Sequence, residues 1–302
     1  METYETVEYK NCTIKIYHDT DAQSPDEWQD DEIVVLGFDD RYFSVERKGF
    51  TQEEIIDAIS GGRYEDGSIN TDARDLAKKF WIFELSLYVH SGTTVRLGES
   101  AGPCGPGRTR YVEPMEKLDR EDAERRARDG VVLISKSEAR TKKEASKRAQ
   151  GTVQMWDQYL NGEVYGFKTV TPDGEELDSC WGFYGDYGIE QIKSEGKSSI
   201  DGWIIEEEAK NKKALERINT SGRVQIYDNG GKSTDRYTII DGTEAYGMSV
   251  NPGSVQGFNQ YIGEAGKLHV PALGKKVSFS KLPAEVKKAI IARVRSSQEL
   301  SL

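Results

Sequence analysis

The sequence predicts an α+β protein, in which a mixed or antiparallel sheet carries helices on one side and is followed by a small β-rich domain with a C-terminal helix. Residues 81–90 alternate apolar and polar side chains, which is typical of a strand with one buried face. Residues 135–160 place apolar side chains three or four positions apart, which is typical of an amphipathic helix. Element order in the first half of the chain is irregular, and no particular topology is predicted.

Helix-capping signals and strand patterns divide the first ninety residues. Residues 24–27, Ser-Pro-Asp-Glu, predict a helix that begins at Pro25 with Ser24 as its N-cap. Residues 51–54, Thr-Gln-Glu-Glu, form a second capping box, and Gly61-Gly62 predicts the end of the helix that it opens. Strands are expected at 6–17, 33–38 and 81–90, and a further helix at 71–79.

The remainder of the chain continues to mix the two kinds of element. A long Gly- and Pro-rich loop is expected at 98–115, and Ser135 with Glu138 predicts the start of the long helix that ends at Leu160. Turn chemistry at 172–174, Pro-Asp-Gly, predicts a hairpin between 163–171 and 175–184. Helices are expected at 119–129, 189–193, 203–218 and from Pro283, with fraying from 296; strands at 131–134, 224–227, 237–240 and 245–250; and a Gly-rich loop at 253–266.

These elements predict three parts along the chain. Residues 1–205 form an N-terminal α+β domain, residues 206–221 a charged helical linker, and residues 222–302 a small β-rich domain that ends in a helix. No window of 18 uncharged apolar residues is present, so no membrane span is expected, and the acidic start of the chain does not have the pattern of a signal peptide. The cytoplasm is the expected location.

The acidic charge of the protein is concentrated near its N-terminus. The net charge of the whole chain is −11, whereas residues 1–40 carry twelve acids and only two bases. A negative surface that docks on a basic partner is one interpretation, and a solvated acidic surface is the other. The expected partner-binding residues are Asp19, Asp21, Asp26, Glu27, Trp28, Asp30, Asp31 and Glu32.

Three cysteines, Cys12, Cys104 and Cys180, form neither a disulfide framework nor a zinc pattern. Cys12 and Cys180 lie in strand-like runs and are predicted to be small core residues. Cys104 lies in the loop Gly102-Pro-Cys-Gly-Pro-Gly107, where a reactive nucleophile is an alternative to a plain loop residue. Because proline has no backbone N–H, the same loop is a poor phosphate cradle.

Two further patterns have competing interpretations. His18, Asp19 and Asp21 are potential ligands of Mg²⁺, although the same residue types suit a turn between a strand and a helix. A basic stripe on two predicted helices suggests phosphate contact, although interleaved acids favour a solvated surface. The stripe consists of Arg125, Arg126, Arg128, Lys142, Lys143, Lys147 and Arg148.

The densest aromatic run of the chain is 178–186, Asp-Ser-Cys-Trp-Gly-Phe-Tyr-Gly-Asp. We interpret it first as a core strand and second as the wall of a binding pocket. Ser179 has no obvious base, and no catalytic residue or cofactor site is predicted anywhere in the chain.

Several long motifs resemble a widespread group of uncharacterised proteins encoded by bacteriophages and plasmids. They are residues 17–21 (YHDTD), 24–28 (SPDEW), 90–92 (HSG), 157–167 (DQYLNGEVYGF) and 178–185 (DSCWGFYG). The resemblance covers roughly residues 10–190 and carries over no catalytic residue. The charged helix inserted within 99–130 departs from the group's pattern, in which a Cys-containing loop leads directly into a strand.

The C-terminal part is similar to a second small group of phage proteins. The motifs that carry this similarity are residues 235–238 (DRYT), 246–249 (YGMS) and 257–261 (GFNQY). The chain therefore looks like a fusion of two phage accessory modules that join near residue 220.

The resemblance and the acidic segment together predict a phage accessory protein that binds and inhibits a host protein. A bacterial anti-phage defence nuclease is the expected kind of target, and the Gabija complex is one example of suitable size. The alternatives are a metal-dependent enzyme that acts on nucleotides and a nucleic-acid-binding protein, although a chain this acidic disfavours the last. Association of the chain with itself is also compatible with the sequence.

Overall fold

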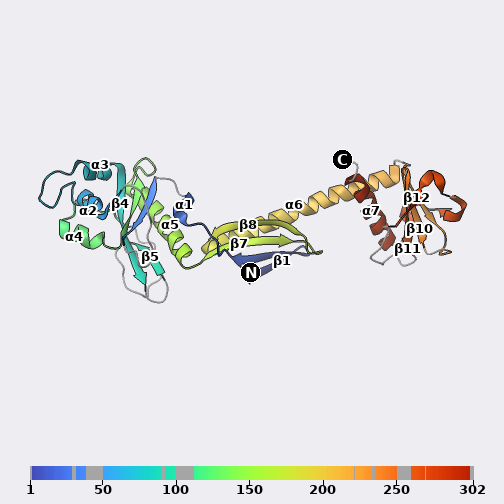
Figure 1. Ribbon diagram of the computed structural model, residues 1–302, viewed down its shortest axis with the longest axis horizontal. Helices are drawn as coiled ribbons and strands as arrows, with labels where there is room; N and C mark the ends of the chain where they lie inside the picture. The colour runs from blue at the N-terminus through green and yellow to red at the C-terminus, as the bar shows by residue number, and fades with distance from the viewer. Residues whose placement is uncertain are drawn as a thin grey trace. The chain divides into compact units, whose positions relative to one another are not determined.

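A computed structural model divides the chain into two compact units, Met1–Ile200 and Asp201–Leu302. It describes residues 2–28, 32–38, 50–89, 93–98, 112–220, 222–232, 235–249, 260–268 and 270–299. The α+β class is confirmed, because helices accompany three antiparallel sheets (Figure 1). Within those residues, no helix combines the length and apolar character that a membrane crossing requires.

Sheet A has the strand order β1-β2-β7-β8. The strands are β1 (Thr3–Tyr9), β2 (Cys12–His18), β7 (Val164–Val170) and β8 (Glu176–Tyr184). The prediction of one strand over 6–17 is wrong, because the chain reverses at Lys10 and Asn11, whose φ angles are 50° and 65°. Both residues lie in the left-handed region that a two-residue hairpin turn requires. The predicted hairpin around Pro-Asp-Gly at 172–174 is confirmed by the β7–β8 pairing.

Helix α6 (Gly185–Thr220) begins immediately after β8 and packs against one face of sheet A. Ile14 and Ile192 are fully buried there, and a Cβ atom added to Gly196 would lie 2.9 Å from the Ile14 Cδ1 atom. The glycine therefore allows the helix to approach the sheet closely. The prediction of two separate helices at 189–193 and 203–218 is wrong, because one helix continues through both glycines, Gly196 and Gly202. Packing against sheet A accounts for the glycine at 196, whereas nothing lies within 4 Å of a Cβ atom added at 202.

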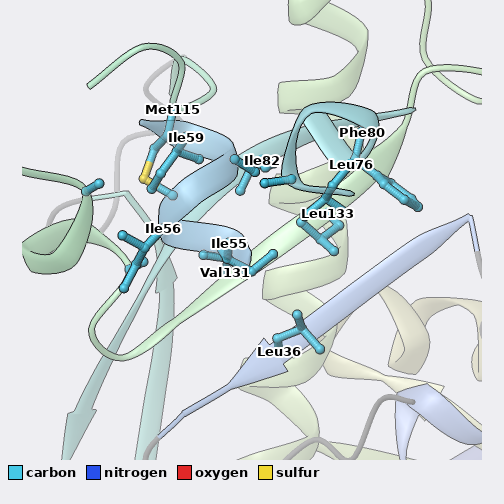
Figure 2. Close-up of a cluster of buried hydrophobic side chains, with 14 of the residues drawn as sticks. Leu36, Ile55, Ile56, Ile59, Leu76, Phe80, Ile82, Met115, Val131 and Leu133 are labelled. Atoms are coloured by element: carbon cyan, nitrogen blue, oxygen red, sulfur yellow. The ribbon is translucent and has the colours of Figure 1, made fainter. Parts of the chain in front are cut away.

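Sheet B has the strand order β3-β6-β4-β5 and is covered by helices on both faces. Its strands are β3 (Ile33–Gly37), β6 (Gly130–Ser135), β4 (Phe80–Val89) and β5 (Thr93–Leu97). Phe83 and Leu85 pack toward α5 (Lys142–Leu160), as the alternation in this strand predicts. Phe80 and Ile82 pack on the opposite face toward α2 (Gln52–Ile59), α3 (Thr71–Lys79) and α4 (Arg120–Arg126) (Figure 2).

The capping signals place most helix starts correctly. The capping box of Thr51 and Glu54 is present, and α3 has the predicted bounds. The short helix α1 (Pro25–Trp28) begins at Pro25 as expected. The predicted start of the long helix at Ser135 is wrong, because Ser135 ends β6 and the capping box that opens α5 is Thr141 with Glu144.

Sheet C belongs to the second unit and has the order β12-β11-β10-β9-β13. Its strands are β9 (Val224–Asp228), β10 (Asp235–Asp241), β11 (Glu244–Ser249), β12 (Gln260–Glu264) and β13 (Lys275–Lys276). Helix α7 (Ala284–Glu299) buries Val286, Ile290 and Val294 completely, as their four-residue spacing predicts. The expected loop at 253–266 contains β12 in its described part, and α7 stays helical beyond the predicted fraying point at 296.

A buried ion pair joins the helices on one face of sheet B. The Asp57 side chain on α2 is 1% exposed and accepts a hydrogen bond from Arg120 Nη1 at 2.8 Å. Its other carboxylate oxygen accepts from Asn70 Nδ2 at 2.7 Å, and Asn70 also caps α3. One carboxylate therefore connects α2 with the starts of both α3 and α4.

Replacing Arg120 with Met should lower the free energy of unfolding by about 3–5 kcal/mol, because it leaves the Asp57 carboxylate buried with a single neutral donor. Urea unfolding followed by circular dichroism measures the loss. The matched control is Lys78→Met, which breaks the exposed pair with Asp75 and should change stability by no more than about 1 kcal/mol. Equal losses in the two variants would contradict the role given to Asp57.

Candidate functional site

The described residues of the predicted acidic surface lie in the turn after β2, on α1 and just before β3. Asp19 follows β2, where its backbone N–H donates to the Val164 carbonyl at 2.8 Å and its Oδ1 accepts from the Asp21 N–H at 3.2 Å. The Glu32 carboxylate accepts from the Ser137 hydroxyl at 2.8 Å, and this serine together with Ser135 lowers the pKa of Glu32. Glu27 is exposed on α1.

The other residues of that surface, Asp30, Asp31 and the side chains of Asp26 and Trp28, lie outside what the structure describes. Asp21 and Glu27 are exposed, whereas Asp19 is half-buried. The acidic surface therefore stays a prediction.

The His18 side chain, one of the three potential metal ligands, contacts other groups of the protein. The His18 Nδ1 atom lies 3.2 Å from the Gly162 carbonyl oxygen, and its ring centroid lies 5.0 Å from that of Tyr165. Burial and the nearby Tyr4 raise the pKa of Tyr165 to about 12. Among the residues that can be described, which include His18, Asp19 and Asp21, no group of three His, Cys, Asp or Glu is placed to hold a metal ion. Metal binding here also stays a prediction.

The basic residues at 125–148 do not form one continuous stripe. Those on α4 and those on α5 lie on opposite faces of sheet B, because the two helices contribute to different hydrophobic clusters. Arg126 Nε donates to the buried Glu84 carboxylate at 2.7 Å, and Lys142 Nζ lies 2.9 Å from Glu116. Arg125 and Arg148 are also paired, with Asp122 and Glu138. Much of this positive charge is therefore neutralised within the protein.

The two described cysteines differ in environment. Cys12 is buried as predicted, and burial raises the pKa of its thiol. Cys180 is exposed, so its prediction as a core residue is wrong. The reason is that β8 is an edge strand with only β7 as its neighbour, and most of its side chains are exposed. Residues 101–111, including Cys104, lie outside the described residues.

The face of sheet A opposite α6 carries an ordered set of side chains, which we call the open face. Its register aligns residues of β2, β7 and β8 in three rows. The first row is aromatic, the second basic and the third ends in an acid. The rows are Tyr17, Gly166 and Trp181; Lys15, Lys168 and Ser179; and Thr13, Val170 and Glu176.

Trp181 is placed on the open face by a bulge. Tyr165 pairs with Phe183 whereas Gly166 pairs with Trp181, so Gly182 is the extra residue, and its φ of 86° is one that glycine adopts readily. Without the bulge, Trp181 and Phe183 would point to the same face, because side chains alternate along a strand. Phe183 instead packs toward Phe167, with ring centroids 5.8 Å apart.

The indole of Trp181 lies across Gly166. A Cβ atom added at Gly166 would come within 2.1 Å of the Trp181 ring, so the absent side chain makes room for the indole. The Trp181 ring centroid lies 6.2 Å from that of Tyr17, and Trp181 remains 36% exposed. The result is a pair of partly exposed aromatic rings with defined positions.

Charged groups of both signs lie in the two rows that follow the aromatic pair along the strands. Lys168 Nζ lies 2.7 Å from the Glu176 carboxylate, and this hydrogen bond raises the pKa of Lys168 and lowers that of Glu176. Lys15 is the cross-strand neighbour of Lys168. The open face therefore combines a pair of aromatic rings with neighbouring charged residues of both signs.

The site has to be argued from its own residues. Comparison with family models, with curated proteins and with solved structures found no match for this chain. The first interpretation of 178–186, a core strand, is wrong, because β8 is an edge strand with mostly exposed side chains. The second interpretation, the wall of a binding pocket, pointed to this segment without selecting a residue. The roles of Tyr17 and Gly166 were missed, and the only signal in the sequence was the glycine in each of the motifs Val-Tyr-Gly-Phe and Cys-Trp-Gly-Phe.

Replacing Gly166 with Ala should displace the Trp181 indole and lower the free energy of unfolding by about 1–3 kcal/mol, because the new methyl group overlaps the ring. The change should be visible in the near-ultraviolet circular dichroism. In a Trp181→Ala background the same substitution should cost much less, which a double-mutant cycle measures. Gly151→Ala on α5 is the control, since nothing lies within 4 Å of the added atom; an equal cost in both backgrounds would contradict the contact.

Proposed function

We propose that this protein is a bacteriophage accessory protein that binds and inhibits a host protein, and that the open face of sheet A is its contact surface. The observation that supports the choice of surface is the pair Tyr17 and Trp181, two partly exposed aromatic rings on a sheet, next to charged residues. Tryptophan and tyrosine are enriched among the residues that dominate protein–protein binding energy. An aromatic centre with a polar rim is also the usual anatomy of a protein interface.

A protein partner fits the charges of this surface better than a nucleic acid does. Single-stranded nucleic acid also stacks on exposed aromatic rings, but it requires a positive path for the backbone. Lys168 is neutralised by Glu176 on the open face, and the chain as a whole carries a net charge of −11. Mixed charge around an aromatic centre instead suits the polar rim of a protein interface.

The class of target that we propose is a defence nuclease complex of the host. The support is the negative charge concentrated in residues 1–40, which would attract the basic surface that a nuclease uses to bind DNA. The acidic segment and the open face are thus two surfaces that a partner could contact. Their energetics differ, because aromatic burial depends little on salt whereas attraction between exposed charges is screened.

Affinity capture of the tagged full-length protein from infected host cells should recover a stoichiometric host protein. The purified partner is then tested against the variant Tyr17→Ala/Trp181→Ala, which should weaken binding about 30-fold or more if these residues are interface hot spots. Tyr64→Ala is the matched control, since Tyr64 is 48% exposed but lies outside the open face.

Recovery of no stoichiometric host protein would overturn the proposed function. Equal binding by the wild type and the double variant would overturn the proposed surface. In that case, loss of binding in an Asp21→Asn/Glu27→Gln variant, with strong weakening by salt, would assign the contact to the acidic segment.

A further inference from the structure

A cavity of about 360 Å³ opens on the face of sheet B that α2 and α3 cover, well separated in the chain from the strands of sheet A. It is formed by the end of α2, the last turns of α3, the start of β4 and two loop segments. Its size falls in the range of small-molecule sites, which is about 300–1,000 Å³. The cavity lining includes three apolar residues of the cluster on this face, one alanine of α3 and two cations: Phe80, Ile82, Met115, Ala77, Arg74 and Lys117.

The floor of the cavity is apolar and well packed. Phe80, Ile82 and Met115 are each no more than 3% exposed and belong to the hydrophobic cluster that supports α2 and α3. Figure 2 shows Met115 beside Ile59, with Ile82 next to them and Phe80 beside Leu76. A ligand in the cavity would therefore meet a preformed apolar surface.

The rim is predominantly cationic. It carries Arg74, Lys78, Lys117 and Lys136 against one acid, Glu116, and that acid pairs with Lys142 at 2.9 Å. Lys78 pairs with Asp75 at 2.8 Å. Among the residues that the structure describes, no carboxylate lies within ion-pair distance of Arg74 or Lys117. The rim therefore has positive charge that the protein does not neutralise locally.

The fold positions the stem of Arg74 and the backbone beside Lys117. A Cβ atom at Gly62 would lie 2.0 Å from the Arg74 Cγ atom, so the stem of the arginine rests directly on this glycine. Lys117 lies between two anchored residues, since the Met115 N–H donates to Ile82 at 2.7 Å and the Leu118 N–H donates to Ile59 at 2.9 Å. Pre-positioned donors lower the entropic cost of binding a ligand.

Lys136, the fourth cation of the rim, makes contacts within the protein. Its ammonium group donates to the Ala77 carbonyl at 2.8 Å, near the end of α3, and lies 4.3 Å from the centroid of the Trp81 ring. Burial lowers the pKa of Lys136. The contacts of Lys136 with the end of α3 and with Trp81 give it a structural role. Arg74 and Lys117 do not take part in those contacts.

We propose that this cavity binds a small organic anion, whose apolar body fills the floor while its phosphate, sulfonate or carboxylate group contacts Arg74 and Lys117. An anion is expected because the rim is positively charged. Hydrogen bonds from a guanidinium or an ammonium group to an anion are stronger than hydrogen bonds between neutral groups. The site is independent of the open face, so a ligand here would be a second binding activity of the protein.

The probe for this site is 1-anilinonaphthalene-8-sulfonate, a fluorescent aromatic anion, titrated into the folded full-length protein. Saturable binding of one probe per chain is expected. The variant Arg74→Gln/Lys117→Gln should weaken it about tenfold, as the loss of two charge-assisted contacts implies. Ala77→Phe, which fills the cavity from α3, should abolish it, and Lys147→Gln on α5 should leave it unchanged.

The neutral analogue N-phenyl-1-naphthylamine separates recognition of the anion from simple apolar binding. It should bind more weakly than the sulfonate to the wild type and equally to the wild type and the charge variant. No saturable binding of either probe, equal affinity for both, or full binding by Ala77→Phe would each overturn the proposal. Thermal unfolding of every variant confirms that the probe reports the folded protein.

Discussion

The pairing of β2 with β7 is the constraint on which the rest of the first unit depends. These neighbouring strands join Thr13 to Val170 at one end and His18 to Tyr165 at the other, and the Asp19 N–H extends the ladder to Val164. All of sheet B and its helices lie in the intervening sequence. Such an insertion is tolerated because the entropic cost of closing a loop rises only slowly with its length.

The same pairing creates the open face. Tyr17 and Gly166 are partners across β2 and β7, and β8 then adds Trp181 to the row. Two glycines then place Trp181 on this face. Gly166 leaves space for the indole, and Gly182 accommodates the bulge that turns Trp181 outward. The cavity on sheet B is lined by residues of other elements, so the proposed partner surface and the proposed ligand site can be tested by separate substitutions.

The sequence predicted correctly the elements whose signals lie within a few residues. It predicted wrongly where the local pattern is compatible with two different structures. The Thr51 capping box and the bounds of α3 were correct because a cap involves residues only three positions apart. Ser135 and Thr141 both begin capping-box patterns, and only the pairing of β6 decides that the chain is still a strand at Ser135. Likewise, the turn at Lys10 and Asn11 interrupts an alternation that continues on both sides of it.

The sequence by itself determined the α+β class, most helix starts and the apolar faces of β4, α5 and α7, because these follow from periodicity and capping within a few residues. Only the tertiary structure decided that β8 is an edge strand, that Cys180 and Trp181 are exposed, and that Arg74 and Lys117 share one rim. Each of these depends on which distant segments pair or pack together, and local patterns carry no information on that choice.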